Sequence, residues 1–186
     1  EVSNSLRFDN GSSDYLSRTP SSTSNRKTWT WSAWVKRANI SANHVMIGAR
    51  IDANDNTFLR FNSDNTIYFK LKIGGTSKES YTNQLFRDSS AWYHLVLAVD
   101  TTQATESNRF KLYINGEQVT SFSSSAYPAQ DADTPINSSS SEHRIGDDET
   151  PNIFDGYMAE VVLVDGQQLD ATSFGEFDED SGIWKP

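Results

Sequence analysis

Apolar and polar residues alternate with a period of two along most of the chain. Residues 29–36 (WTWSAWVK) and 66–73 (TIYFKLKI) place apolar side chains at every second position, which is the pattern of a half-buried strand. Residues 92–100 (WYHLVLAVD) are apolar at both phases, which predicts a central strand buried on both faces. Residues 157–166 (YMAEVVLVDG) predict a further strand. The chain therefore reads as a series of strands.

Turn signals separate these strands, and helical periodicity is nearly absent. Asn115-Gly116 lies between two β-rich runs, which is the strongest short-range hairpin signal. One short helical turn is expected within residues 169–177, with Asp170 or Thr172 as its cap. We therefore predict an all-β fold, an antiparallel jelly-roll β-sandwich, formed by residues 1–186 as a single domain.

Two polar stretches interrupt the strand pattern. Residues 21–27 connect the first strands to the tryptophan-rich one, and residues 123–142 form a long segment rich in Ser, Asp and Pro. A loop of that length is either functional or a mobile excursion at the surface, and we favour the mobile excursion.

Composition narrows the range of partners. The net charge is −9 with a pI near 4.7, which disfavours nucleic acids and anionic membrane surfaces. The chain has no apolar run long enough for membrane insertion. Cysteine is absent, which excludes disulfides and thiolate metal sites. The first residue is Glu rather than Met, so we expect a processed chain or a fragment of a longer one.

Three adjacent carboxylates, Asp147, Asp148 and Glu149, form an acidic cluster. Like charges repel, so a cluster of this kind is either well solvated or neutralised by a cation. A second acidic stretch at residues 52–56 (DANDN) also has the composition of an ordinary turn. Both stretches remain open to a structural or a metal-binding role at this level.

The order of several motifs resembles the laminin G-like and pentraxin-like domains of the concanavalin A-like jelly-roll superfamily. The resemblance covers nearly the whole chain. It is most specific in three segments, which are the Trp-x-His strand at residues 92–94, the strand ending at Asn115-Gly116, and the strand over residues 154–161 (FDGYMAEV).

The resemblance to pentraxin-like domains implies a calcium site built from two loops. The implied ligands are Asp55, Asn56, Asp147, Asp148 and Glu149, all of them oxygen donors of the kind calcium prefers. Relatives with a different ion position imply an alternative around Asp9, Asn10 and Asp14.

A narrower resemblance links the chain to laminin G-like domains in virion structural proteins of marine bacteriophages. It rests on residues 14–20 (DYLSRTP), 25–37 (NRKTWTWSAWVKR) and 164–186 (VDGQQLDATSFGEFDEDSGIWKP). It implies a virion or extracellular location, with other virion proteins as partners.

Candidate catalytic groups are few. No nucleophile elbow, zinc-protease motif or phosphate loop occurs, and His44, His94 and His143 lie far apart in the sequence. Glu176, Asp178 and Asp180 have the spacing of some glycosidase acids, but the segment lacks the apolar pattern of a central strand. We read it as a polar tail before Trp184.

Aromatic side chains could instead stack on sugar rings. We expect Trp29, Trp31 and Trp92 to be core residues and Tyr68 to be more exposed. The predicted ligand-binding residues are Tyr81, Tyr127 and, in the loop that carries Asp55, Asn54.

The sequence thus favours a non-catalytic module that binds a glycan or cell-surface polysaccharide, with calcium as a candidate cofactor. The alternatives are a purely structural virion assembly or decoration domain and a glycan-degrading enzyme.

Overall fold

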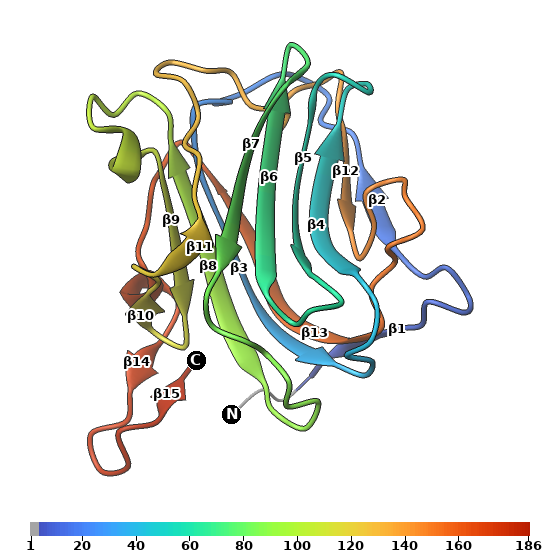
Figure 1. Cartoon of the computed structure of the whole chain (residues 1–186), viewed down its shortest axis with the longest axis vertical. Coiled ribbons are helices and arrows are strands. Elements are labelled where there is room, and N and C mark those ends of the chain that lie inside the picture. Colours follow the sequence, from blue (N-terminus) through green and yellow to red (C-terminus); the bar gives the residue numbers. More distant parts are fainter. Residues whose placement is uncertain (1–3) are drawn as a thin grey trace.

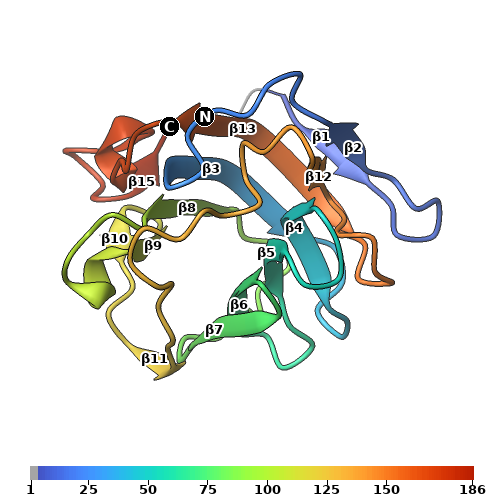
Figure 2. The ribbon, with the colours of Figure 1, turned by 90° about the horizontal axis from the view of Figure 1, so that it is seen from above.

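Two antiparallel β-sheets pack face to face in a computed structural model that describes residues 4–186 (Figures 1 and 2). The six-stranded sheet runs in the order β1 (Leu6–Phe8), β13 (Gly156–Asp165), β3 (Thr28–Arg37), β8 (Tyr93–Asp100), β9 (Phe110–Ile114) and β10 (Glu117–Gln118). The seven-stranded sheet runs in the order β11 (Phe122–Ser124), β7 (Thr76–Thr82), β6 (Ile67–Ile73), β5 (Asn56–Phe61), β4 (His44–Arg50), β12 (Glu142–Ile145) and β2 (Leu16–Arg18). This architecture confirms the predicted jelly-roll sandwich.

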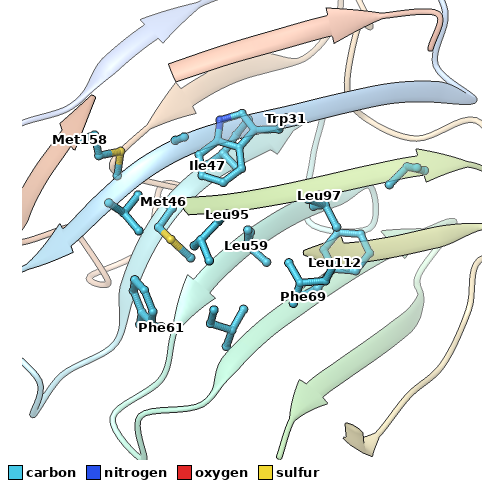
Figure 3. Packing of buried hydrophobic residues seen from close by; sticks show 14 of the residues in the cluster. Trp31, Met46, Ile47, Leu59, Phe61, Phe69, Leu95, Leu97, Leu112 and Met158 are labelled. Carbon is cyan, nitrogen blue, oxygen red and sulfur yellow. The ribbon is translucent and has the colours of Figure 1, made fainter. Parts of the chain in front are cut away.

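The core lies between the two sheets and is built from the side chains that point inward from the strands of both (Figure 3). Trp29 and Trp31 of β3 are at most 1% exposed, as the alternation predicted. Leu95 and Leu97 of the central strand β8 pack against the same cluster. Because inward residues of both sheets interdigitate, the sandwich excludes water without disulfides.

The outer face of β3 is buried as well, although the alternation predicted a half-buried strand. A small third sheet of β14 (Glu176–Phe177) and β15 (Trp184–Lys185) lies beside the six-stranded sheet (Figure 1). Trp184 is 7% exposed and packs in a second cluster with Trp34. Trp92, predicted to lie in the core, is partly buried in this second cluster.

Trp184 is anchored by a buried histidine. The Trp184 Nε1–H donates to His94 Nδ1 at 3.0 Å, so the ring proton of His94 lies on Nε2, which donates to Ser32 Oγ at 2.9 Å. Adding a Cβ to Gly116 would bring it to 2.3 Å from the Trp184 ring, so the hairpin glycine also makes room for the indole. The last residues are therefore part of the packed fold.

The local predictions are mostly confirmed. Asn115 and Gly116 have positive φ angles of 49° and 87° and join β9 to β10. A 3₁₀ turn, η2 (Ala171–Ser173), follows Asp170, whose side chain accepts a hydrogen bond from the Thr172 N–H. A second 3₁₀ turn, η1 (Glu106–Asn108), precedes β9. Within residues 4–186, no helix is long and apolar enough to cross a membrane.

The long polar segment at residues 123–142 is more closely packed than the prediction of a mobile surface excursion implied. Residues 134–138 are buried, and Ile136 belongs to the core cluster. Trp29 Nε1 donates to Thr134 Oγ1 at 2.9 Å, which ties the segment to β3. The serine-rich composition concealed these few buried positions.

Candidate functional site

The outer face of the seven-stranded sheet carries an ordered array of aromatic and charged side chains. Strand register defines two neighbouring rows on this face, because cross-strand partners project on the same side. The tyrosine row comprises Val45, Arg60, Tyr68 and Tyr81 on β4, β5, β6 and β7. The phenylalanine row comprises Gly48, Phe58, Lys70 and Glu79 on the same four strands.

The tyrosine row contains a pair of stacked rings. Tyr68 and Tyr81 lie with their centroids 4.4 Å apart and their planes at 5°. Tyr68 is only 5% exposed, so the prediction that it is one of the better exposed aromatics is wrong: Tyr81 and Phe58 cover it from two sides. Tyr81 is half-buried, and its hydroxyl donates to Glu79 Oε2 at 3.1 Å. Tyr81 is thus the accessible ring of the pair.

Two cations lie over the aromatic rings of these rows. The Arg60 guanidinium lies 4.7 Å from the Tyr68 centroid and 5.3 Å from that of Phe58. Lys70 Nζ lies 5.5 Å from the Phe58 centroid. These distances are within the range of cation–π attraction, which holds both side chains against the sheet.

A small cavity of about 170 Å³ adjoins the phenylalanine row. Its lining includes Phe58, Lys70, Asn56, Asp148 and Thr150. Asp148 is 8% exposed, and burial raises the pKa of its carboxyl, although a hydrogen bond from Thr150 Oγ1 offsets part of this effect. The cavity is smaller than a drug-sized binding site, so it suits one ring substituent or a few water molecules.

Gly48 allows the acidic loop to lie on this face. A Cβ at Gly48 would come within 2.7 Å of the Asp147 carbonyl oxygen and 2.8 Å of Asp148 Cβ. The loop at residues 146–150 therefore rests directly on β4, which brings Asp148 next to the phenylalanine row.

The acidic cluster is neutralised largely by arginines. Arg144 pairs with Asp147 at 2.5 Å and with Glu142 at 2.9 Å, and Glu149 pairs with Arg50 at 3.3 Å. The Asp147 Oδ1 also accepts hydrogen bonds from the backbone N–H groups of residues 148 and 149. Burial lowers the pKa of Arg144, but its hydrogen bonds to these carboxylates outweigh that effect and raise it.

The predicted calcium ligands are only partly brought together. Asn56 and Asp148 line the same cavity. Asp55 Oδ1 instead accepts a hydrogen bond from the Gly74 N–H at 3.0 Å, and Asp147 and Glu149 are paired with arginines. Within residues 4–186, no group of three acidic or histidine side chains is placed to hold a metal ion.

As arranged, this donor set does not fit calcium, which takes six to eight oxygen ligands. At the alternative position, Asp9 Oδ1 accepts from the Gly11 N–H and Asp14 Oδ2 accepts from the Asp9 N–H, so both side chains hold the local turn. A calcium ion at the acidic loop would require the ion pairs of Arg144 and Arg50 to open. The calcium binding that the resemblance implies stays untested, and the arrangement of these side chains argues against it.

Thermal unfolding tests this point. Because the arginines already compensate Asp147 and Glu149, we expect the melting temperature in excess calcium to match that in EDTA within about 1 °C. A calcium site occupied at 100 times its dissociation constant would instead add about 2.7 kcal/mol, or on the order of 5–10 °C. A rise of that size, lost in Asp148→Asn, would show that the loop rearranges to bind calcium.

The other sequence candidates lie elsewhere. Tyr127 is half-buried and packs on Phe110 at 5.1 Å between centroids, so it does not join Tyr81. Asn54 is exposed in the β4–β5 turn, where its N–H donates to Asp52 Oδ1. His94 is 1% exposed and packed, as expected.

Of the suspected glycosidase acids, Glu176 is on β14 of the small third sheet, and Asp178 and Asp180 follow in the turn to β15. Glu176 and Asp178 both pair with Lys185, at 3.3 and 3.2 Å, and Asp180 is exposed. They therefore do not project from a central strand into a cleft.

Sequence reasoning missed Phe58, Arg60 and Lys70. Their signal was available, because Phe58 and Arg60 are two residues apart and hence share a face of β5.

The sequence pattern of the concanavalin A-like lectin/glucanases superfamily matches residues 10–171. The chain belongs to this superfamily. None of the curated proteins matches the sequence.

Three solved structures illustrate the similarity of this superfamily member to known proteins. Domains LG4-5 of the mouse laminin α1 chain superpose with a TM-score of 0.64 at 13% identity, covering 91% of this chain and 44% of theirs. The IT-sialidase CBM40 of Ruminococcus gnavus gives 0.59 at 14% identity, covering 80% of each chain. Tailspike protein 2 of Escherichia coli O157:H7 bacteriophage CAB120 gives 0.60 at 16% identity, covering 85% of this chain and 22% of the tailspike. At such identities the similarity shows the fold alone.

Proposed function

We propose that this chain is a non-catalytic carbohydrate-binding module whose site is the outer face of the seven-stranded sheet. The observation that carries the proposal is Tyr81, an accessible ring backed by Tyr68, which in turn carries the Arg60 guanidinium. A supported ring of this kind can stack on a sugar without losing much conformational freedom on binding.

The polar groups of the rows complement this ring. Glu79 and Asp148 offer carboxylate oxygens, and Arg60 and Lys70 offer N–H donors, so sugar hydroxyls find both acceptors and donors. The R. gnavus CBM40 has also been solved bound to α2,3-sialyllactose, which supports carbohydrate as the ligand class for this fold.

The non-catalytic part of the proposal rests on the carboxylates. Glycosidases use two acids flanking the scissile bond, one of them free to act as nucleophile or base. Near the site, Asp148 is buried and accepts a hydrogen bond from Thr150. Asp147 is engaged by Arg144, and Glu79 accepts a hydrogen bond from the Tyr81 hydroxyl. Hydrolysis of a polysaccharide that is lost in Asp148→Asn or Glu176→Gln would favour the enzyme alternative.

We further propose a virion or extracellular setting, in a phage tail, fibre or surface decoration, with other virion proteins as partners. The support is the similarity of the closing motif to phage proteins and of the fold to a phage tailspike. Mass spectrometry of purified particles from the source tests this location. A purely structural virion domain remains the competing function.

A glycan array probed with the wild-type chain and with Tyr81→Ala separates these two functions. We expect binding to a defined set of glycans and a loss of roughly tenfold or more in affinity in Tyr81→Ala, since stacking on an aromatic ring supplies part of the binding energy. Tyr127→Ala is the matched control, because it removes a half-buried tyrosine away from the site. If no glycan binds, the carbohydrate-binding function is wrong. If a glycan binds and Tyr81→Ala binds it as tightly as wild type does, the proposed site is wrong.

A further inference from the structure

We propose that the site selects glycans that carry a single carboxylate, held by Arg60 and Lys70 beside the sugar ring stacked on Tyr81. This inference rests on the proposed function and narrows its ligand to acidic sugars such as sialic or uronic acids.

The first argument is the bonding of the cations on this sheet. Arg144 and Arg50 pair with carboxylates, and Lys72 Nζ donates to the Ala53 carbonyl at 2.8 Å. Arg60 bonds the Asn62 side chain through Nε at 2.8 Å, and its charge acts on the nearby Asp148 carboxylate. Its two terminal nitrogens have no hydrogen bond or ion pair within residues 4–186. Within the same residues, Lys70 Nζ has no hydrogen bond or ion pair and contacts the Phe58 ring instead.

The second argument is the way these two cations are placed. Both lie over the same ring, Phe58, at 5.3 and 5.5 Å from its centroid, so both charged groups border that ring. Arg60 also lies 4.7 Å from the Tyr68 centroid. When a guanidinium is fixed on aromatic faces, its terminal N–H groups are available for a planar, two-point contact with a carboxylate.

The third argument concerns the number of charges that the site accepts. In the phenylalanine row, Glu79 is directly opposite Lys70, and Asp148 lies over Gly48 at the other end. The net charge of the chain is −9. Arg60 and Lys70 favour one anion beside Phe58. A polysulfated chain would in addition meet acids on both sides and a negative protein around it. A single carboxylate on an otherwise neutral glycan fits this pattern.

The ring stacking sets the position of the sugar. Tyr81 is the cross-strand neighbour of Tyr68, and Tyr68 is the neighbour of Arg60, so all three lie in one row. Tyr68 covers one face of Tyr81 and lies between it and Arg60, so a sugar on the free face of Tyr81 reaches Arg60 through a second sugar unit that passes along the outer edges of both rings. The site would read the carboxylate and the sugar face together.

The experiment uses an array printed with sialylated and uronic acid oligosaccharides, each beside its methyl ester, and with heparin fragments. Calorimetry then measures the affinity of wild type, Arg60→Gln and Lys70→Gln for each acid that binds and for its methyl ester. Lys111→Gln is the matched control, since it removes one positive charge from β9 of the other sheet. Circular dichroism confirms that each variant is folded.

We expect each bound acid to bind at least tenfold more tightly than its ester, because a charge-assisted contact is lost in the ester. We also expect the preference for the acid over its ester to fall to within about twofold in Arg60→Gln and in Lys70→Gln but not in Lys111→Gln. Heparin should bind no better than the esters. Comparison of the sialylated with the uronic acid oligosaccharides shows which class of acidic sugar the site binds.

Three results would overturn the inference. Equal binding of acids and esters that still depends on Tyr81 would leave the carbohydrate-binding function intact and remove the carboxylate selection. Preferential heparin binding would show a polyanion site. Absence of binding to every glycan would remove both the function and the inference.

Discussion

Trp184→Ala should destabilise the folded chain by about 3–5 kcal/mol, the usual cost of truncating a buried tryptophan. Trp184 is 7% exposed, packs with Trp34 on the outer face of the six-stranded sheet, and donates its indole N–H to His94. The truncation empties this space and leaves His94 Nδ1 without a donor. For a chain of this length the loss corresponds to roughly 10 °C in melting temperature.

Chemical denaturation measures this effect, with Ile183→Ala as the control. Ile183 is the adjacent residue but is 66% exposed, so its truncation should change stability by less than about 0.5 kcal/mol. Trp184→Phe would retain part of the packing and lose the hydrogen bond, which separates the two contributions. If Trp184→Ala costs less than about 1 kcal/mol, the C-terminal segment is only loosely attached.

Stability should also fall as the pH drops from about 7 toward 4. Burial lowers the pKa of His94 to about 4, and it lowers the pKa values of His44 and His143 as well. In the unfolded chain a histidine titrates near 6.5, so between these values the unfolded state binds more protons than the folded one. The contribution of His94 is fully present above about pH 6.5 and is lost as the pH falls toward 4.

Between pH 7 and pH 5 this one residue should account for about 2 kcal/mol of the lost stability. The measurement is urea unfolding at both pH values for wild type and for His94→Gln, whose amide can still accept the Trp184 N–H. We expect the pH-dependent loss to be smaller in His94→Gln by about that amount. An identical pH dependence in the two proteins would mean that His94 is already charged, or accessible, in the fold.

The fold could be predicted from the sequence because its signals are local. Alternation along β3 and β6 and the Asn115-Gly116 turn depend on neighbours within a few residues. The burial of both faces of β3 could not be predicted, since it depends on Trp184, which lies about 150 residues later in the chain.

The candidate site was only partly predictable for the same reason. Tyr81 was identified as a ligand-binding residue, but its backing by Tyr68 and the nearby cations arise from strand register. The acidic cluster suggested calcium because its composition is visible in the sequence. Arg144 lies only three residues before Asp147, so this pair is local in the sequence. Arg50 becomes a neighbour of the acidic loop only when β12 pairs with β4. Charge compensation across strands is not encoded in any short motif.

The most direct test of the carbohydrate-binding account is an NMR titration of the isotope-labelled chain with the tightest glycan from the array. We predict that the shifted amides map to β5, β6 and β7 and to residues 146–150, with Tyr81 and Arg60 among the largest changes. The contrary result would be shifts confined to another cavity, such as that of about 430 Å³ between Asn115–Ser121 and Trp184. That outcome would place the glycan site between the β9–β10 hairpin and the third sheet, and it would contradict the assignment to the outer face of the seven-stranded sheet.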